Sequence, residues 1–163
     1  VSAEADGVQL SDLPSTPFAP ELSHCVLSLD GAVPARVLDG DGYTALLKPF
    51  RTVEDLRVSA AVAGLHVRLA AEAGWPHALR ERWLAFAATL RGLDDADPKQ
   101  PATHLALAGA LAGSRQLQED SAVHWALCEP ELAARMQRDT PLMGLARRVQ
   151  RSRRERAREL WAE

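Results

Sequence analysis

The stretch from Gly40 to Gly64 constrains the fold more than any other part of the chain. It begins with the tight turn Gly40-Asp41-Gly42, continues as a short apolar run interrupted by Pro49, and then takes on helical periodicity. The residues before this stretch alternate like β-strands, and those after it repeat like helices. We therefore predict a mainly α fold, with a short β-rich segment over residues 1–42 and an antiparallel bundle of four or five helices over residues 43–163.

The N-terminal segment contains one clear strand. Apolar and polar residues alternate over residues 22–30, with Cys25, Leu27 and Leu29 on one side, and Asp30-Gly31 ends the run. Residues 33–38 predict a further short edge strand, whereas three prolines between residues 14 and 20 predict an irregular segment. Two or three strands cannot close a barrel, so these need other strands or a helical surface to pack on.

The rest of the chain predicts five helical segments. Thr52 is the expected N-cap of the first helix, which ends at Gly74, and the small residues of the third suit close packing. The others are expected from Pro76 to about Arg91, from Pro101, over residues 121–138 with a step at Glu129-Pro130, and from Leu142 to about Trp161.

Composition excludes several classes of protein. The net charge is −3, so no overall basic field attracts nucleic acid, and no apolar run is long enough to span a membrane. Seven arginines lie within residues 147–158, but interleaved glutamates favour a solvated helix or a subunit contact over a phosphate-binding surface. Cys25 and Cys128 have no metal-ligand spacing, which favours a reducing compartment, so we expect a cytoplasmic location.

Glu54 is the one candidate catalytic residue. On a helical wheel it lies in line with Val58, Ala61 and Leu65, so its carboxylate is expected to be partly desolvated and suited to accept a proton. The alternative is an acid placed by the helix dipole and paired with Arg51 or Arg57. The five histidines are scattered and no carboxylates gather around them, so we expect no metal site.

The junction resembles that of acyl-CoA dehydrogenases, where a middle β-domain passes into a C-terminal helical bundle. The family's V-P-x-x-x-L-x-G-x-G-Y pattern is similar to residues 33–43, Val-Pro-Ala-Arg-Val-Leu-Asp-Gly-Asp-Gly-Tyr. The resemblance implies that the chain is the C-terminal part of such a flavoprotein. In the isovaleryl and long-chain branches the catalytic base lies ten residues before a helix glycine, and Glu54 holds that position before Gly64.

The implied reaction is α,β-dehydrogenation of an acyl-CoA thioester, with hydride transfer to FAD. The chain departs from the family at Asp55, where arginine is common, and it lacks the family's flavin turn and N-terminal helical domain. We therefore do not expect it to hold FAD well or to be active by itself. The alternative is a non-enzymatic helical bundle for assembly or ligand binding, derived from that scaffold, and in either case a homo-oligomer is expected.

Overall fold

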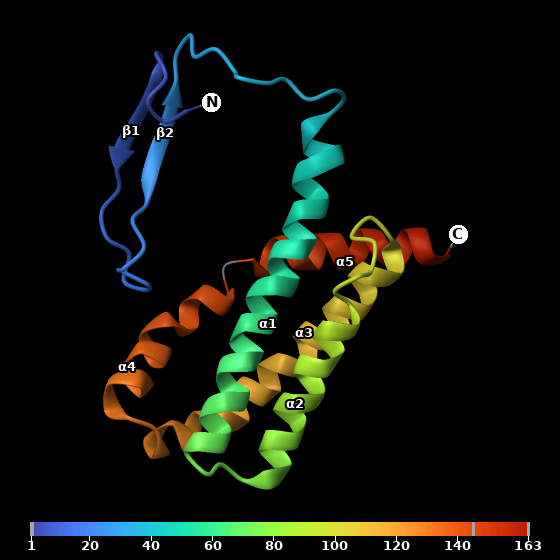
Figure 1. The fold of residues 1–163 in the computed structure, drawn as a ribbon. Coiled ribbons are helices and arrows are strands. Elements are labelled where there is room, and N and C mark those ends of the chain that lie inside the picture. The colour runs from blue at the N-terminus through green and yellow to red at the C-terminus, as the bar shows by residue number, and fades with distance from the viewer. Residues whose placement is uncertain (1, 145, 163) are drawn as a thin grey trace.

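A computed structural model describes residues 2–144 and 146–162, without the side chains of Leu142 and Met143. Over these residues the protein is mostly helical, with a two-stranded antiparallel sheet near the N-terminus (Figure 1). The predicted class, mainly α with a short β-rich start, is confirmed. Strands lie before residue 30, and the first helical turn begins at Tyr43.

The sheet is a hairpin of β1 (Val8–Asp12) and β2 (Cys25–Leu29). The strand predicted within residues 22–30 is therefore confirmed. The edge strand predicted over residues 33–38 is wrong, because that stretch has no strand pairing. The strand that pairs with β2 is β1, which was not predicted. Gly7 allows the chain to enter the hairpin, since its φ is +77° and an added Cβ would lie 2.1 Å from the Asp30 carbonyl oxygen.

The first long helix, α1 (Lys48–Glu72), follows a π-helical turn at Tyr43–Leu47. Asp41 caps that turn, because its carboxylate accepts bonds from the backbone N–H groups of Tyr43 at 3.0 Å and Thr44 at 3.2 Å. The prediction that Thr52 caps the helix is wrong. Pro49 fits inside the first turn, where no backbone donor is needed, so the helix starts earlier and Thr52 is buried within it.

Four further helices follow, with ends close to the predicted ones. They are α2 (His77–Gly92), α3 (Pro101–Ser121), α4 (Pro130–Asp139) and α5 (Arg147–Ala162), with 3₁₀ turns at Ala122–Leu127 and Thr140–Gly144. Gly74, with φ of +65°, ends α1 as predicted, and the step at Glu129-Pro130 separates the 3₁₀ turn from α4. The fifth helix begins later than Leu142, and the residue at position 145 lies outside the described residues.

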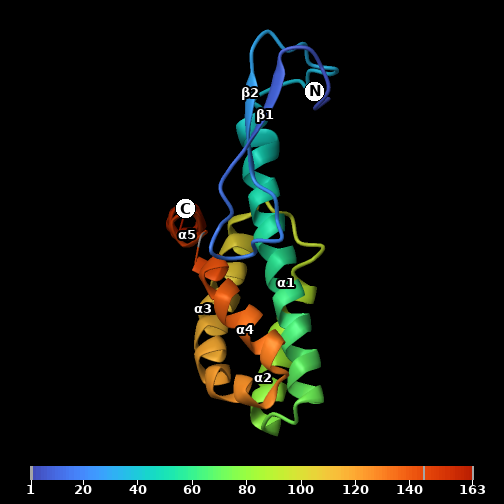
Figure 2. The ribbon, with the colours of Figure 1, turned by 90° about the vertical axis from the view of Figure 1, so that its left-hand side faces the viewer.

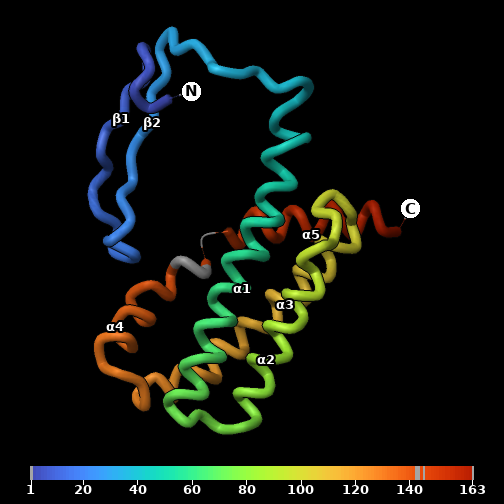
Figure 3. Tube along the Cα trace, in the orientation of Figure 1, coloured from blue at the N-terminus to red at the C-terminus, as the bar shows by residue number. Residues whose placement is uncertain are grey.

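The helices α1, α2 and α3 run down, up and down beside one another, whereas α5 lies across them (Figures 1 and 2). The antiparallel bundle of four or five helices is thus not confirmed as a whole. The core lies between α1, α2 and α3 and is built on Trp75, Trp83, Leu79, Leu90 and Leu107. The chain trace shows the hairpin joined to α1 by an extended linker, with its two strands apart from the core helices (Figure 3). The loop between the strands contacts the end of α4.

Candidate functional site

Glu54 lies on the outer face of α1 and is exposed. Its neighbours at helical spacing are apolar and also uncovered: Leu47 is 41 % exposed, Phe50 57 % and Val58 53 %. Of the predicted stripe, Val58 and Ala61 are exposed and Leu65 is half-buried, so the predicted desolvation of Glu54 is wrong for this structure. We call Leu47, Phe50, Glu54 and Val58 the α1 stripe.

The alternative pairing of Glu54 is not seen either. Among the described residues no ion pair joins Glu54 to Arg51 or Arg57, and Arg57 instead pairs with Asp94 at 2.9 Å. The role of Glu54 as a base stays a prediction that requires something else to cover the α1 stripe.

The buried face of α1 carries an unexpected number of polar residues. Its buried residues are Thr52, Leu56, Ser59, Ala63, His66, Leu69 and Ala70. Three of these seven side chains are polar, although apolar side chains of the same helix are exposed, which departs from what hydrophobic periodicity alone predicts. The explanation lies in two polar clusters that α1 forms with other helices.

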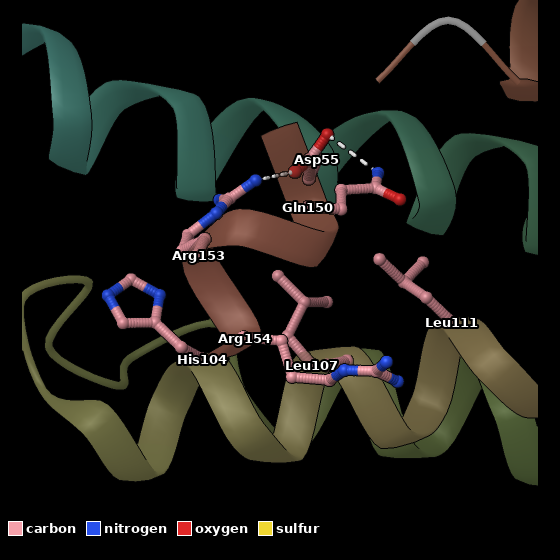
Figure 4. Close-up of a pocket in the computed structure, with 8 residues that line it drawn as sticks. Asp55, His104, Leu107, Leu111, Gln150, Arg153 and Arg154 are labelled. Atoms are coloured by element: carbon pink, nitrogen blue, oxygen red, sulfur yellow. Dashed lines mark hydrogen bonds and ion pairs between the residues drawn. The ribbon is translucent and has the colours of Figure 1, made fainter. Parts of the chain in front are cut away.

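The first cluster joins α1 to α5 through Asp55 and Arg153 (Figure 4). The Asp55 carboxylate accepts bonds from the Arg153 guanidinium and from the Gln150 amide, the latter at 3.1 Å. Arg153 also donates to the Thr52 hydroxyl at 2.7 Å. The side chains of Asp55 and Arg153 are only 12 % and 17 % exposed, so the pair is well shielded from water.

A small cavity lies beside this cluster, between α1, α3 and α5 (Figure 4). Its volume is about 20 Å³, room for about one water molecule but not for an organic ligand. His104 from α3 lines it, and its Nδ1 lies 3.5 Å from the Thr52 hydroxyl. Burial and then the nearby Arg153 charge lower the pKa of His104. The cluster therefore anchors α5 and offers no substrate site.

The second cluster surrounds His66. Its ring stacks on Trp83, with centroids 3.9 Å apart, and meets the edges of Trp75 and Trp125. Nδ1 lies 2.8 Å from the Val62 carbonyl oxygen, so in the neutral ring Nδ1 carries the proton and donates it to this oxygen. Burial lowers the pKa of His66, so the ring stays neutral near neutral pH. Trp75, Trp83 and Trp125 are therefore packing residues of the helical core.

The hairpin has one apolar face. The strand register places Val8 opposite Leu29 and Leu10 opposite Leu27, and Cys25 ends the same face opposite Asp12. Leu10, Leu27 and Leu29 are 54 %, 55 % and 57 % exposed. We call Val8, Leu10, Leu27 and Leu29 the hairpin face.

A hollow of about 330 Å³ lies at the end of the hairpin near Gly7. Backbone, small polar side chains and the carboxylates of Asp6 and Asp30 line it, and it is distant in sequence from Glu54. It contains no basic group to bind a phosphate or a carboxylate. It therefore does not match an acyl-CoA or flavin site.

Other candidate sites receive no support from the geometry. No group of three or more His, Cys, Asp or Glu side chains in the described part of the chain could hold a metal ion. None of the described helices is long and apolar enough to cross a membrane. Of the arginines in α5, Arg153 faces the interior and Arg156 pairs with Glu159 at 2.9 Å, which fits the predicted helix with intrahelical pairs.

The exposed surface as a whole is large. The chain exposes 11,360 Å², whereas a compact monomer of 17.7 kDa exposes about 8,000 Å², which leaves an excess of roughly 3,400 Å². Most of the large apolar side chains that are exposed lie in the hairpin, the linker and the first turns of α1. One feature of the sequence points to this surface: the strand segment is too small to form its own core.

Comparisons with protein-family models, with curated proteins and with solved structures found no match to this chain.

Proposed function

We propose that the chain is a helical-bundle assembly protein that associates with another polypeptide through its N-terminal surface. The observation that carries the proposal is the excess of roughly 3,400 Å² of exposed surface, which is within the range of obligate interfaces. Most of the exposed large apolar side chains among the described residues lie on the hairpin, the linker and the start of α1, and exposed apolar side chains gathered in one part of a molecule favour a covering partner.

The two halves of the chain differ in how well they are packed. The helical body has a continuous core in which Trp75, Trp83 and Leu90 are almost completely buried. The hairpin has no such core, and a two-stranded hairpin is marginally stable in water unless it packs on something else. The helical body therefore suits the role of a scaffold and the hairpin that of a binding element.

Sedimentation velocity tests this function. We expect the wild-type chain to form species of at least twice the 17.7 kDa of one chain. Leu27→Thr combined with Leu29→Thr should shift these species toward monomer, because threonine keeps the strand propensity but removes apolar surface. Leu84→Thr is the matched control, since Leu84 is equally exposed at 54 % but lies on α2.

Two results would contradict assembly through this surface. One is a wild-type chain that stays monomeric at every concentration. The other is a Leu84→Thr variant that loses association as strongly as the hairpin variant does.

A second candidate function is part of an acyl-CoA dehydrogenase-like flavoprotein in the cytoplasm, with FAD as cofactor and an acyl-CoA as substrate. It is favoured by Glu54, a carboxylate placed between exposed apolar side chains on the α1 stripe. A domain that covered the stripe would desolvate this carboxylate and make it a stronger base. The residues of this chain would then supply the base, and FAD would accept the hydride.

Flavin absorbance separates the two functions. A longer protein that contains this chain should purify yellow if it is a flavoprotein, and Glu54→Gln should abolish exchange of the substrate's α-proton. Normal exchange in Glu54→Gln would remove Glu54 as the base. A colourless protein that ignores FAD would leave assembly as the function.

A further inference from the structure

We propose that the covering partner is a second copy of this chain, in a reciprocal exchange: the hairpin face of each copy packs on the α1 stripe of the other. This inference rests on the proposed assembly function and names its partner and its contact residues. It makes two equivalent contacts related by a two-fold axis, the commonest symmetry of protein dimers.

The two surfaces match in chemistry. The hairpin face presents Leu10, Leu27 and Leu29, and the α1 stripe presents Leu47, Phe50 and Val58, all exposed by 41 % to 57 %. Each surface is a single amphipathic side of a regular element, so one can lie flat on the other. Helix-on-sheet packing of this kind is the ordinary way for a small sheet to bury its apolar face.

Charge favours hairpin-to-helix contact over hairpin-to-hairpin contact. Residues 1–42 contain seven acidic residues and one arginine, a net charge of −6, so two hairpins repel each other. The helix α1, which carries the stripe, contains four basic and three acidic residues, a net charge of +1. On the contact itself, Asp12 borders the hairpin face, while Lys48 and Arg51 border the α1 stripe and Glu54 is the acid within it.

The hairpin is held away from the α1 stripe of its own chain. The loop between the strands is attached to the end of α4, where Asp139 accepts a bond from the backbone N–H of Ala19 at 2.7 Å. Arg138 adds a two-pronged ion pair to Glu21, at 2.9 and 3.0 Å. The linker fixes the other end of the hairpin beyond the start of α1 (Figures 1 and 3). If the hairpin face packed on the α1 stripe of its own chain, the attachment to α4 would break. Packing on the α1 stripe of a second copy preserves this attachment.

The area is sufficient for a stable dimer. Specific interfaces bury about 1,200–2,000 Å² in total and obligate dimers bury up to about 5,000 Å². Each chain has an excess of roughly 3,400 Å², so two chains have more uncovered surface than even an obligate dimer requires.

Cross-linking with the native Cys25 tests the exchange. Cys25 ends the hairpin face and is exposed, and Cys128 is replaced by serine to leave one thiol. Val53→Cys then adds a thiol beside the α1 stripe, at a position that is 38 % exposed, and leaves the stripe residues intact. Isotopically light and heavy chains are mixed, treated with a short bismaleimide, digested and analysed by mass spectrometry.

We expect abundant cross-links from Cys25 to residue 53 that join a light and a heavy chain. Leu84→Cys on α2, used in place of Val53→Cys, is the matched control. We expect its cross-link to Cys25 to be at least tenfold less abundant than the link from Cys25 to residue 53. Links from Cys25 to residue 53 within one chain would overturn the exchange in favour of closure.

A chain that sediments as a dimer but gives no preferential link between the two positions would overturn the exchange and leave the assembly function standing. A chain that stays monomeric would contradict both.

Discussion

Removing the Asp55 carboxylate should loosen α5 and destabilise the helical body. In Asp55→Ala, Arg153 loses a shielded ionic partner and Gln150 loses its acceptor. A hydrogen bond to a charged group contributes about 1.5–3 kcal/mol and a neutral one about 1 kcal/mol. Because Arg153 keeps its bond to Thr52, we expect the free energy of unfolding to fall by about 2–3 kcal/mol.

Urea unfolding followed by tryptophan fluorescence measures this loss, since Trp75 and Trp83 are buried in the helical core. The melting temperature should fall by roughly 4–12 °C in a chain of this length. Glu54→Ala is the matched control: it removes the adjacent carboxylate, which is exposed, and should change stability by less than about 0.5 kcal/mol in dilute protein.

A double-mutant cycle separates the contact from other effects. Combining Asp55→Ala with Arg153→Met should reveal a coupling of about 1–2 kcal/mol, because each single change removes the same interaction. Equal small losses in Asp55→Ala and Glu54→Ala, with no coupling to Arg153, would refute the view that this pair anchors α5.

Two further properties follow from buried or constrained groups. Burial lowers the pKa of His66, so the unfolded chain binds the extra proton first, and stability should fall as the pH decreases below about 6.5, by up to about 1.4 kcal/mol per pH unit. His66→Gln should reduce the pH dependence of the urea midpoint in that window. An unchanged pH dependence would contradict the burial of a neutral ring. Gly7→Ala should speed hydrogen exchange in both strands because its Cβ would clash with the Asp30 carbonyl. Gly31→Ala, with a similar positive φ but open space, should have the smaller effect, and equal effects would show that the close approach is unimportant.

Local signals in the sequence located most of the helix ends. Gly74, Pro101 and Pro130 act through their own backbone restrictions, so their consequences can be predicted without knowing the tertiary fold. The alternation of apolar and polar residues that predicted β2 is also a local signal. Apolar and polar residues also alternate in β1, but the prolines that follow it at positions 14, 17 and 20 favour irregular structure.

The orientation of α1 could not be predicted in the same way. Its buried side carries Thr52 and His66, whose side chains contact partners from distant parts of the chain. Arg153 satisfies Thr52 from 101 residues away, and Trp83 stacks on His66 from another helix. Because periodicity records hydrophobicity and not these partners, it assigned Glu54 to a covered face that the structure leaves open.

Hydrogen exchange measured at low and high protein concentration tests the central claim, that the uncovered N-terminal surface mediates association. The account predicts that added protection at high concentration is confined to β1, β2 and residues 43–58, while α2 and α4 keep the same exchange rates. Protection that grows on α2 or α4 instead, or no concentration dependence in the hairpin, would contradict it.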